Sequence, residues 1–131
     1  MRRASFTAAL VIVVAAAAYG GYWLWRSAEG RTWALTSTAG APTRAIPLFI
    51  ANGCAGCHQI TGVPGARGKT GPPLSGISER QYIGGVLTNT PDNLISWIRA
   101  ARAINPQTAM PTTNVSEQDA RDMAAYLYAL N

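Results

Sequence analysis

The feature of this sequence that most restricts its fold is the placement of its two cysteines and its single histidine. All three lie in the run Cys54-Ala55-Gly56-Cys57-His58. Two cysteines this close together do not build a disulfide framework. A structural zinc site takes four ligands, and the chain has no further cysteine or histidine to complete one. A thioredoxin-like redox pair needs a surrounding βαβ pattern, which the sequence does not show.

The pattern C-x-x-C-H is instead typical of covalent haem attachment. Each thiol, of Cys54 and of Cys57, adds to one vinyl group of the porphyrin, and His58 then ligates the iron through a ring nitrogen. The small residues Ala55 and Gly56 let the turn lie close to the haem edge. We therefore expect one haem c, held covalently. A thiol oxidoreductase, the rival class, predicts free cysteines and a colourless protein.

The second axial ligand is sought among the three methionines. Met1 is the initiator, and Met123 lies on the apolar stripe of the last predicted helix, where methionine usually fills the core. Met110 lies in a loop between two predicted helices, so its unbranched thioether can reach across to the iron. We predict Met110 as the ligand, and His/Met ligation raises the reduction potential.

A ligating histidine usually donates its other ring N–H to a carbonyl or carboxylate. The run Gly71-Pro72-Pro73-Leu74 follows His58 at loop distance, and Pro72 offers a carbonyl on a stiff backbone. We predict the Pro72 carbonyl as the acceptor. The predicted cofactor-binding residues are therefore Cys54, Cys57, His58, Pro72 and Met110, of which His58 and Met110 bind the metal.

The N-terminal part of the chain contains 22 uncharged residues, from Ala4 to Trp25. As a helix, this run would extend about 33 Å, close to the thickness of the hydrocarbon layer of a bilayer. Its far end is rich in tyrosine and tryptophan, which prefer the membrane interface, and Arg2 and Arg3 precede it. We predict a single transmembrane anchor over residues 1–26, with lipid contacts through residues 4–25 and the N-terminus in the cytoplasm.

Two alternatives for this segment stay open. It could be a cleaved signal peptide, since Ala15 to Ala18 offer small residues for cleavage, although the apolar run continues beyond them. Its many small residues would allow it to pack closely against another membrane helix, but they are equally compatible with a helix that stands alone in lipid. Both the anchor and the signal peptide place the remaining chain outside the cytoplasm.

The rest of the chain divides into a linker and a domain. Residues 27–43 are rich in Ser, Thr, Ala and Gly, and they predict a flexible linker. Residues 44–131 predict an all-α domain, because no segment shows the alternation of apolar and polar residues that is typical of a strand. Its glycines and prolines leave a thin apolar core, so a small domain of this kind usually needs a cofactor.

The helices of this domain are marked by their starts and their apolar stripes. A first helix is expected from near Pro47, a second from Pro91 with Thr90 as N-cap, and a third after Ser116, with Asp119 completing a capping box. The second should end before Asn105. The apolar faces of the last two helices are Leu94, Trp97, Ile98 and Ala101, and Ala120, Met123, Leu127 and Leu130.

The charge distribution argues against nucleic-acid binding. The chain carries a formal charge of +5, but Arg2, Arg3 and Arg26 flank the apolar run. From Ser27 onward there are eight basic and six acidic residues, so this part has no strong positive charge. The run Gly65 to Thr70 resembles a phosphate-binding loop, but Val63 stands where its first glycine is required.

From Ala45 to Leu130 the sequence resembles class I cytochromes c. The matching features are Phe49 five residues before Cys54, C-A-G-C-H at 54–58, G-P-P-L at 71–74, A-M-P at 109–111 and A-Y-L at 125–127. The stretch 85–98 is similar to the cytochrome c domain fused to subunit II of some bacterial haem–copper oxidases. This sequence contains neither the two-helix membrane portion nor the copper-binding cupredoxin domain of that fusion.

The resemblance implies an electron-transfer protein and not an enzyme, with the first and last helices crossing near Phe49 and Tyr126. It implies a haem domain on the periplasmic side of a bacterial cytoplasmic membrane, with a quinol-oxidising complex or a terminal oxidase as redox partner. A mobile shuttle and a fixed subunit of a respiratory complex both fit. The alternative function is a haem-based gas sensor or small haem catalyst, which needs an open iron position, and Met110 argues against it.

Overall fold

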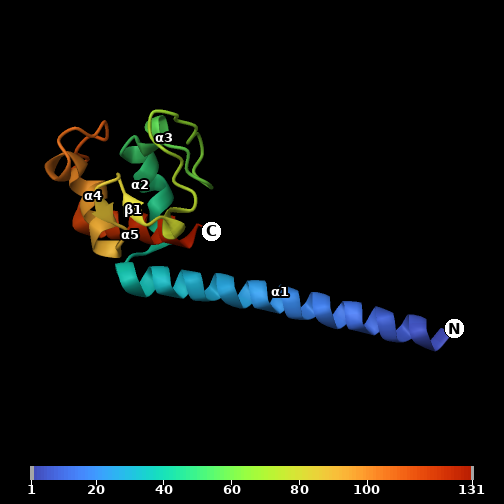
Figure 1. Ribbon diagram of the computed structural model, residues 1–131. Coiled ribbons are helices and arrows are strands. Elements are labelled where there is room, and N and C mark those ends of the chain that lie inside the picture. Colours follow the sequence, from blue (N-terminus) through green and yellow to red (C-terminus); the bar gives the residue numbers. More distant parts are fainter. Residues whose placement is uncertain (1, 131) are drawn as a thin grey trace. The chain divides into compact units, whose positions relative to one another are not determined.

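The computed structural model describes residues 2–130, and its helices and strands are shown in Figure 1. The chain forms two compact units, Met1–Gly30 and Arg31–Asn131. Helix α1 (Arg2–Thr38) makes up the described part of the first unit and contributes its last residues to the second. The second unit contains all the other elements, and it carries the predicted site residues.

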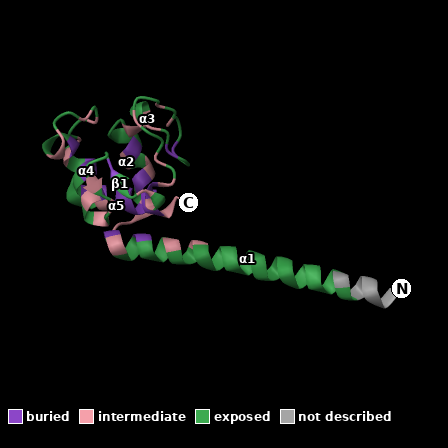
Figure 2. Ribbon diagram, viewed as in Figure 1, coloured by how far each residue is buried: buried purple, intermediate pink, exposed green. Residues whose placement is uncertain are grey.

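Helix α1 is long and apolar enough to be a candidate membrane span over Ala9–Thr38, with a mean hydropathy of 1.3. None of its most apolar window is buried by protein. The side chains of Leu10 to Val14 are exposed, as Figure 2 shows by the colour of the helix. A run of 30 residues extends about 45 Å as a helix, more than a bilayer core requires.

Part of residues 27–43, for which the sequence predicted a flexible linker, is helical in the structure. Helix α1 continues to Thr38, and the side chains of Ala34 and Thr38 are wholly buried. The hydroxyls of Thr36, Ser37 and Thr38 each donate to the carbonyl four residues before them, so this polar segment satisfies its own side chains inside the helix. The proposed division of the chain at residues 26 and 43 stays a prediction.

Two helices cross beside the motif. Helix α2 (Ala45–Ala51) packs on helix α5 (Glu117–Ala129), with the rings of Phe49 and Tyr126 edge to face and 5.6 Å between their centroids. This is the crossing that the resemblance led us to expect. Helix α2 begins two residues before Pro47, after a 3-10 turn at Pro42–Arg44.

The predicted starts of the later helices are confirmed. Helix α4 spans Pro91–Ile104, and the Asn93 amide donates to the Thr90 hydroxyl at 3.3 Å. Helix α5 follows Ser116, whose hydroxyl accepts from the Asp119 amide at 3.1 Å and donates to the Asp119 carboxylate at 2.7 Å. Local capping chemistry therefore sets where both helices begin.

The remaining elements are short. They are helix α3 (Cys54–Cys57), a 3-10 turn at Ile77–Glu79, and a hairpin of β1 (Tyr82–Ile83) and β2 (Leu87–Thr88). The strands run antiparallel, with Tyr82 opposite Thr88. Strands of two residues carry no alternating pattern, which is why the sequence did not indicate them. The other regular elements of the domain are helical, as expected, and long loops connect them.

Candidate functional site

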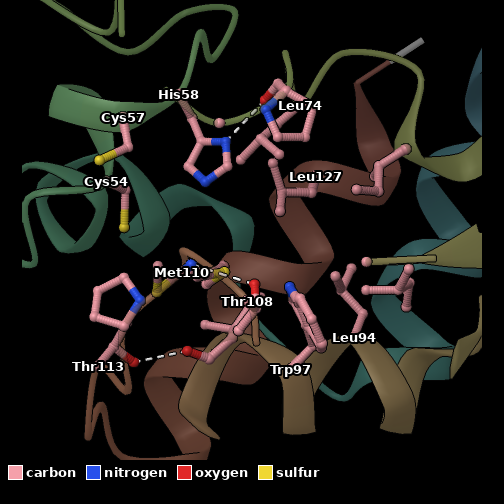
Figure 3. Close-up of a pocket in the computed structure, with 18 of the residues that line it drawn as sticks. Cys54, Cys57, His58, Leu74, Leu94, Trp97, Thr108, Met110, Thr113 and Leu127 are labelled. Atoms are coloured by element: carbon pink, nitrogen blue, oxygen red, sulfur yellow. Dashed lines mark hydrogen bonds between the residues drawn. The ribbon is translucent and has the colours of Figure 1, made fainter. Parts of the chain in front are cut away.

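All five predicted site residues line one cavity of about 250 Å³ in the second unit. Figure 3 shows this cavity, with the Cys54–His58 turn on one wall and the loop of Met110 on another. Helices α4 and α5 supply its apolar floor. Its larger apolar lining residues are Phe49, Leu74, Ile77, Ile83, Leu94, Trp97, Ile98, Met123 and Leu127.

The two cysteines lie at the ends of the single helical turn α3. The carbonyl of Cys54 accepts from the His58 amide at 2.9 Å, which closes the turn and places His58 beside the two thiols. Both thiols are free, Cys54 half-buried and Cys57 exposed. Burial raises the pKa of the Cys54 thiol, so this group is protonated at neutral pH.

The imidazole of His58 is held by the loop that follows it. Its Nδ1 atom lies 2.8 Å from the carbonyl oxygen of Pro72. A carbonyl only accepts, so Nδ1 carries the proton and donates, and the lone pair of Nε2 is left free. Figure 3 shows this second nitrogen directed into the cavity. The ring therefore presents the atom that a metal would bind.

Gly71 allows this approach of loop to ring. A Cβ atom on Gly71 would meet His58 Cε1 at 2.3 Å and Nδ1 at 2.6 Å, so any larger residue would displace the imidazole. The Gly71 amide donates to the Cys57 carbonyl at 2.8 Å, which fixes the loop on the turn that carries the histidine. The sequence suggested a role for Pro72 but gave no sign that Gly71 contacts the ring.

Met110 lies across the cavity from His58 (Figure 3). It is half-buried in the loop between α4 and α5, and its amide donates to the Thr108 hydroxyl at 3.2 Å. The thioether and the imidazole therefore belong to separate segments and face the same apolar space. Met123 also lines the cavity, on α5, with 1% of its surface exposed.

Several polar residues of the cavity were missed at the level of sequence, among them Arg80 and Thr113. Arg80 donates from its guanidinium to the carbonyls of Pro73 and Ser75, and it stands at the cavity wall. Thr113 also reaches the cavity, three residues after Met110. Neither residue belongs to a recognisable motif, so only the folded chain brings them to the site.

These residues fit a haem group. Its flat apolar ring suits an apolar cavity, iron accepts imidazole nitrogen and thioether sulfur, and two thiols stand beside the histidine. Among residues 2–130, no group of three or more His, Cys, Asp and Glu side chains could hold a metal by itself. A multi-ligand zinc site is thus not formed by the described residues.

The fold and the cavity are those of a small helical protein whose residues suit a haem. The family model for Cytochrome c matches residues 44–131, and the chain belongs to the cytochrome c family. The family implies haem c as the cofactor. The two cysteines of this chain have the spacing that its attachment needs.

The chain is also similar to a curated relative, "Cytochrome c oxidase subunit 2" of Alkalihalophilus pseudofirmus. The two are 36% identical over 84 residues, which is 63% of this chain and 24% of the relative. The chain thus matches about a quarter of the length of that relative. No solved structure gives a significant match. The expected likeness to the cytochrome domain of an oxidase subunit II is confirmed.

Proposed function

We propose that this chain is a membrane-anchored monohaem c-type cytochrome that transfers single electrons to or within a respiratory complex such as a terminal oxidase. The observation that carries the proposal is the placement of His58 and Met110 on facing walls of one apolar cavity beside Cys54 and Cys57. Nitrogen and sulfur ligands from opposite sides suit an iron that exchanges electrons and does not bind substrate.

Each residue of the site has a role in this proposal. Cys54 and Cys57 hold one haem through two thioether bonds, and His58 and Met110 ligate its iron. Pro72 accepts the Nδ1 proton of His58, which fixes the tautomer and the orientation of the ring. When bound, the haem supplies an iron that takes up or gives up one electron.

The chain contributes orientation and exclusion of water. The apolar side chains that α4 and α5 contribute to the cavity would lower the dielectric around a bound haem, which disfavours the more highly charged ferric state. A thioether ligand acts in the same direction. His58 is held by its contact with Pro72 and Met110 by its contact with Thr108, so the chain itself would keep both side chains in place beside a bound haem.

The proposed face for the redox partner surrounds Cys57 and the loop Gly62–Lys69. Cys57 is exposed, and the loop packs on its backbone so closely that a Cβ atom on Gly68 would meet the Cys57 carbonyl carbon at 2.3 Å. Arg67 and Lys69 are exposed on this loop. The name of the relative, cytochrome c oxidase subunit 2, supports a respiratory oxidase as the partner.

Helix α1 supports the membrane anchor. Tyr19, Tyr22, Trp23 and Trp25 are all exposed on it, which suits an interfacial belt. The basic N-terminus predicts the cytoplasmic side for the start of the helix and the periplasmic side for the haem domain. The packing of residues 31–38 shortens the predicted tether, and for this reason we favour a fixed subunit over a mobile shuttle.

Purification of the full chain from a bacterium that attaches haem c tests the proposal. We expect a coloured protein whose mass includes one haem that stays bound after denaturation. The ferric form should show the far-red sulfur–iron absorption band, and the ferrous form should bind carbon monoxide poorly. A colourless product refutes the proposal, and rapid carbon monoxide binding without the band favours the sensor.

Two variants assign the sulfur ligand. Met110→Ala should lose the far-red band and bind carbon monoxide readily. Met123→Leu conserves volume in the core and should keep the band. Copurification from native membranes, followed by identification of neighbouring chains, identifies the redox partner, and a chain that always elutes alone contradicts the fixed-subunit proposal.

A further inference from the structure

Helix α4 is interrupted just where the Met110 loop returns to it. Ala100 has non-helical backbone angles, φ −146° and ψ 51°, within the span Pro91–Ile104. At such a break the carbonyls before it lose the regular geometry of a helix and need other donors. The carbonyls concerned here are those of Ile98 and Arg99.

Thr113 supplies most of those donors. Its hydroxyl donates to the Ile98 carbonyl at 2.7 Å, and its amide donates to the Arg99 carbonyl at 3.2 Å. The Asn114 amide adds a third contact, to Arg99 at 3.3 Å, with Asn114 in the left-handed region at φ 56°. Asparagine tolerates that conformation better than most residues. The loop is therefore tied to the break by backbone and side chain together.

Met110 lies between these hydrogen bonds of Thr113 and a second set at the start of the loop. At the start of the loop, the Thr108 amide donates to the Asn105 carbonyl and the Gln107 amide donates to the Asn105 side chain, both at 3.1 Å. Thr113 is only three residues beyond Met110, so the chain between them reaches about 10 Å at most. Fixing Thr113 thus confines where the Met110 sulfur can lie.

We propose that Thr113 is the positioning residue that holds the Met110 sulfur on the haem iron, through its hydrogen bonds to the broken helix α4. The inference rests on the proposed function, because it needs Met110 as the iron ligand. Without the Thr113 hydroxyl, the Ile98 carbonyl loses a donor and the loop gains conformations in which the sulfur is displaced. A small competing ligand would then replace the thioether more easily.

Imidazole titration of the full-length ferric protein in detergent tests this inference. Imidazole competes for the position of the sulfur, and loss of the far-red sulfur–iron band reports its binding. Thr113→Val removes the hydroxyl and keeps the branched shape, and we expect its dissociation constant for imidazole to fall about tenfold. Thr113→Ser should restore the wild-type constant to within about twofold.

Two controls separate positioning from general stability. Thr112→Val makes the same change at the neighbouring exposed threonine and should leave the constant unchanged. Ile95→Val trims a buried side chain of α4 outside the cavity lining, so it should lower the melting temperature without changing imidazole affinity. If Thr113→Val does not accumulate with haem, Thr113→Ala removes the same hydroxyl.

The outcomes distinguish this inference from the proposed function. An imidazole constant for the hydroxyl-free variant within about twofold of wild type overturns the role of Thr113 and leaves His/Met ligation intact. An equal change in Ile95→Val also overturns it, because the effect would then follow stability alone. A wild-type protein without the sulfur–iron band contradicts the proposed function itself.

Discussion

The indole ring of Trp33 meets the phenol ring of Tyr128 edge to face, with 5.1 Å between ring centroids and 88° between ring planes. The contact joins the last turns of α1 to the last turns of α5. Trp33 lies in the segment that the sequence predicted to be a flexible linker. It makes residues from Arg31 onward part of the folded domain.

Replacement of Trp33 by alanine should lower the free energy of unfolding of the haem domain by about 1 kcal/mol, because an edge-to-face pair and some apolar burial are lost. Denaturant titration of the protein in detergent, followed by haem absorbance, measures this. Trp25→Ala removes an exposed tryptophan of the same helix outside the second unit and should leave the midpoint unchanged. Equal effects of the two variants would contradict a specific role for the Trp33 contact.

The sequence predicted what local chemistry determines. The hydrogen bonds of Thr90 and Ser116 involve residues three positions away, so the starts of α4 and α5 could be read from single turns of chain. The motif at Cys54–His58 is local in the same sense. The break in α4 at Ala100 is accompanied by hydrogen bonds from the distant residue Thr113, and the last turns of α1 contact the distant residue Tyr128. No local sequence pattern predicts either feature.

The carboxylate of Asp122 is wholly buried and connects α5 to the chain that follows α1. Its Oδ1 atom accepts from the Ala41 amide at 2.8 Å and from the Gln118 amide group at 3.0 Å. Its Oδ2 atom forms an ion pair with Arg44 at 3.1 Å that lacks hydrogen-bond geometry. The carboxylate is thus held mainly through one oxygen.

Asp122→Asn should cost about 2 kcal/mol of unfolding free energy, because an amide cannot pair with the Arg44 guanidinium. The loss is smaller than for a fully buried pair, since the Arg44 side chain is 58% exposed. Chemical denaturation with asparagine at the exposed Asp92 as control measures it. A change within about 0.5 kcal/mol in both variants would show that the buried carboxylate contributes little.

Tyr128 should ionise late in an alkaline titration. Burial raises the pKa of Tyr128 to about 12 from an ordinary value of 10.0. The folded pKa is raised, so the stability from the neutral phenol is fully present below pH 10 and is lost as pH rises through about 12. Near-ultraviolet absorbance of phenolate should show a phase near that pH which is absent in Tyr128→Phe. Persistence of the late phase in that variant would assign it to another tyrosine.

Alanine at Gly71 should disturb the proximal side of the proposed haem site, where His58 lies. Its Cβ would lie 2.3 Å from the His58 ring, so either the ring turns away from Pro72 or the loop shifts. We expect a loss of about 2 kcal/mol in unfolding free energy. We also expect a higher reduction potential, because a weaker bond to Pro72 makes His58 a less basic ligand.

Gly56→Ala is the matched control, since a Cβ there meets nothing within 4 Å. Redox titration and denaturant unfolding of both variants measure the two effects, and a Gly71→Ala protein indistinguishable from Gly56→Ala would mean that the loop yields without moving the imidazole.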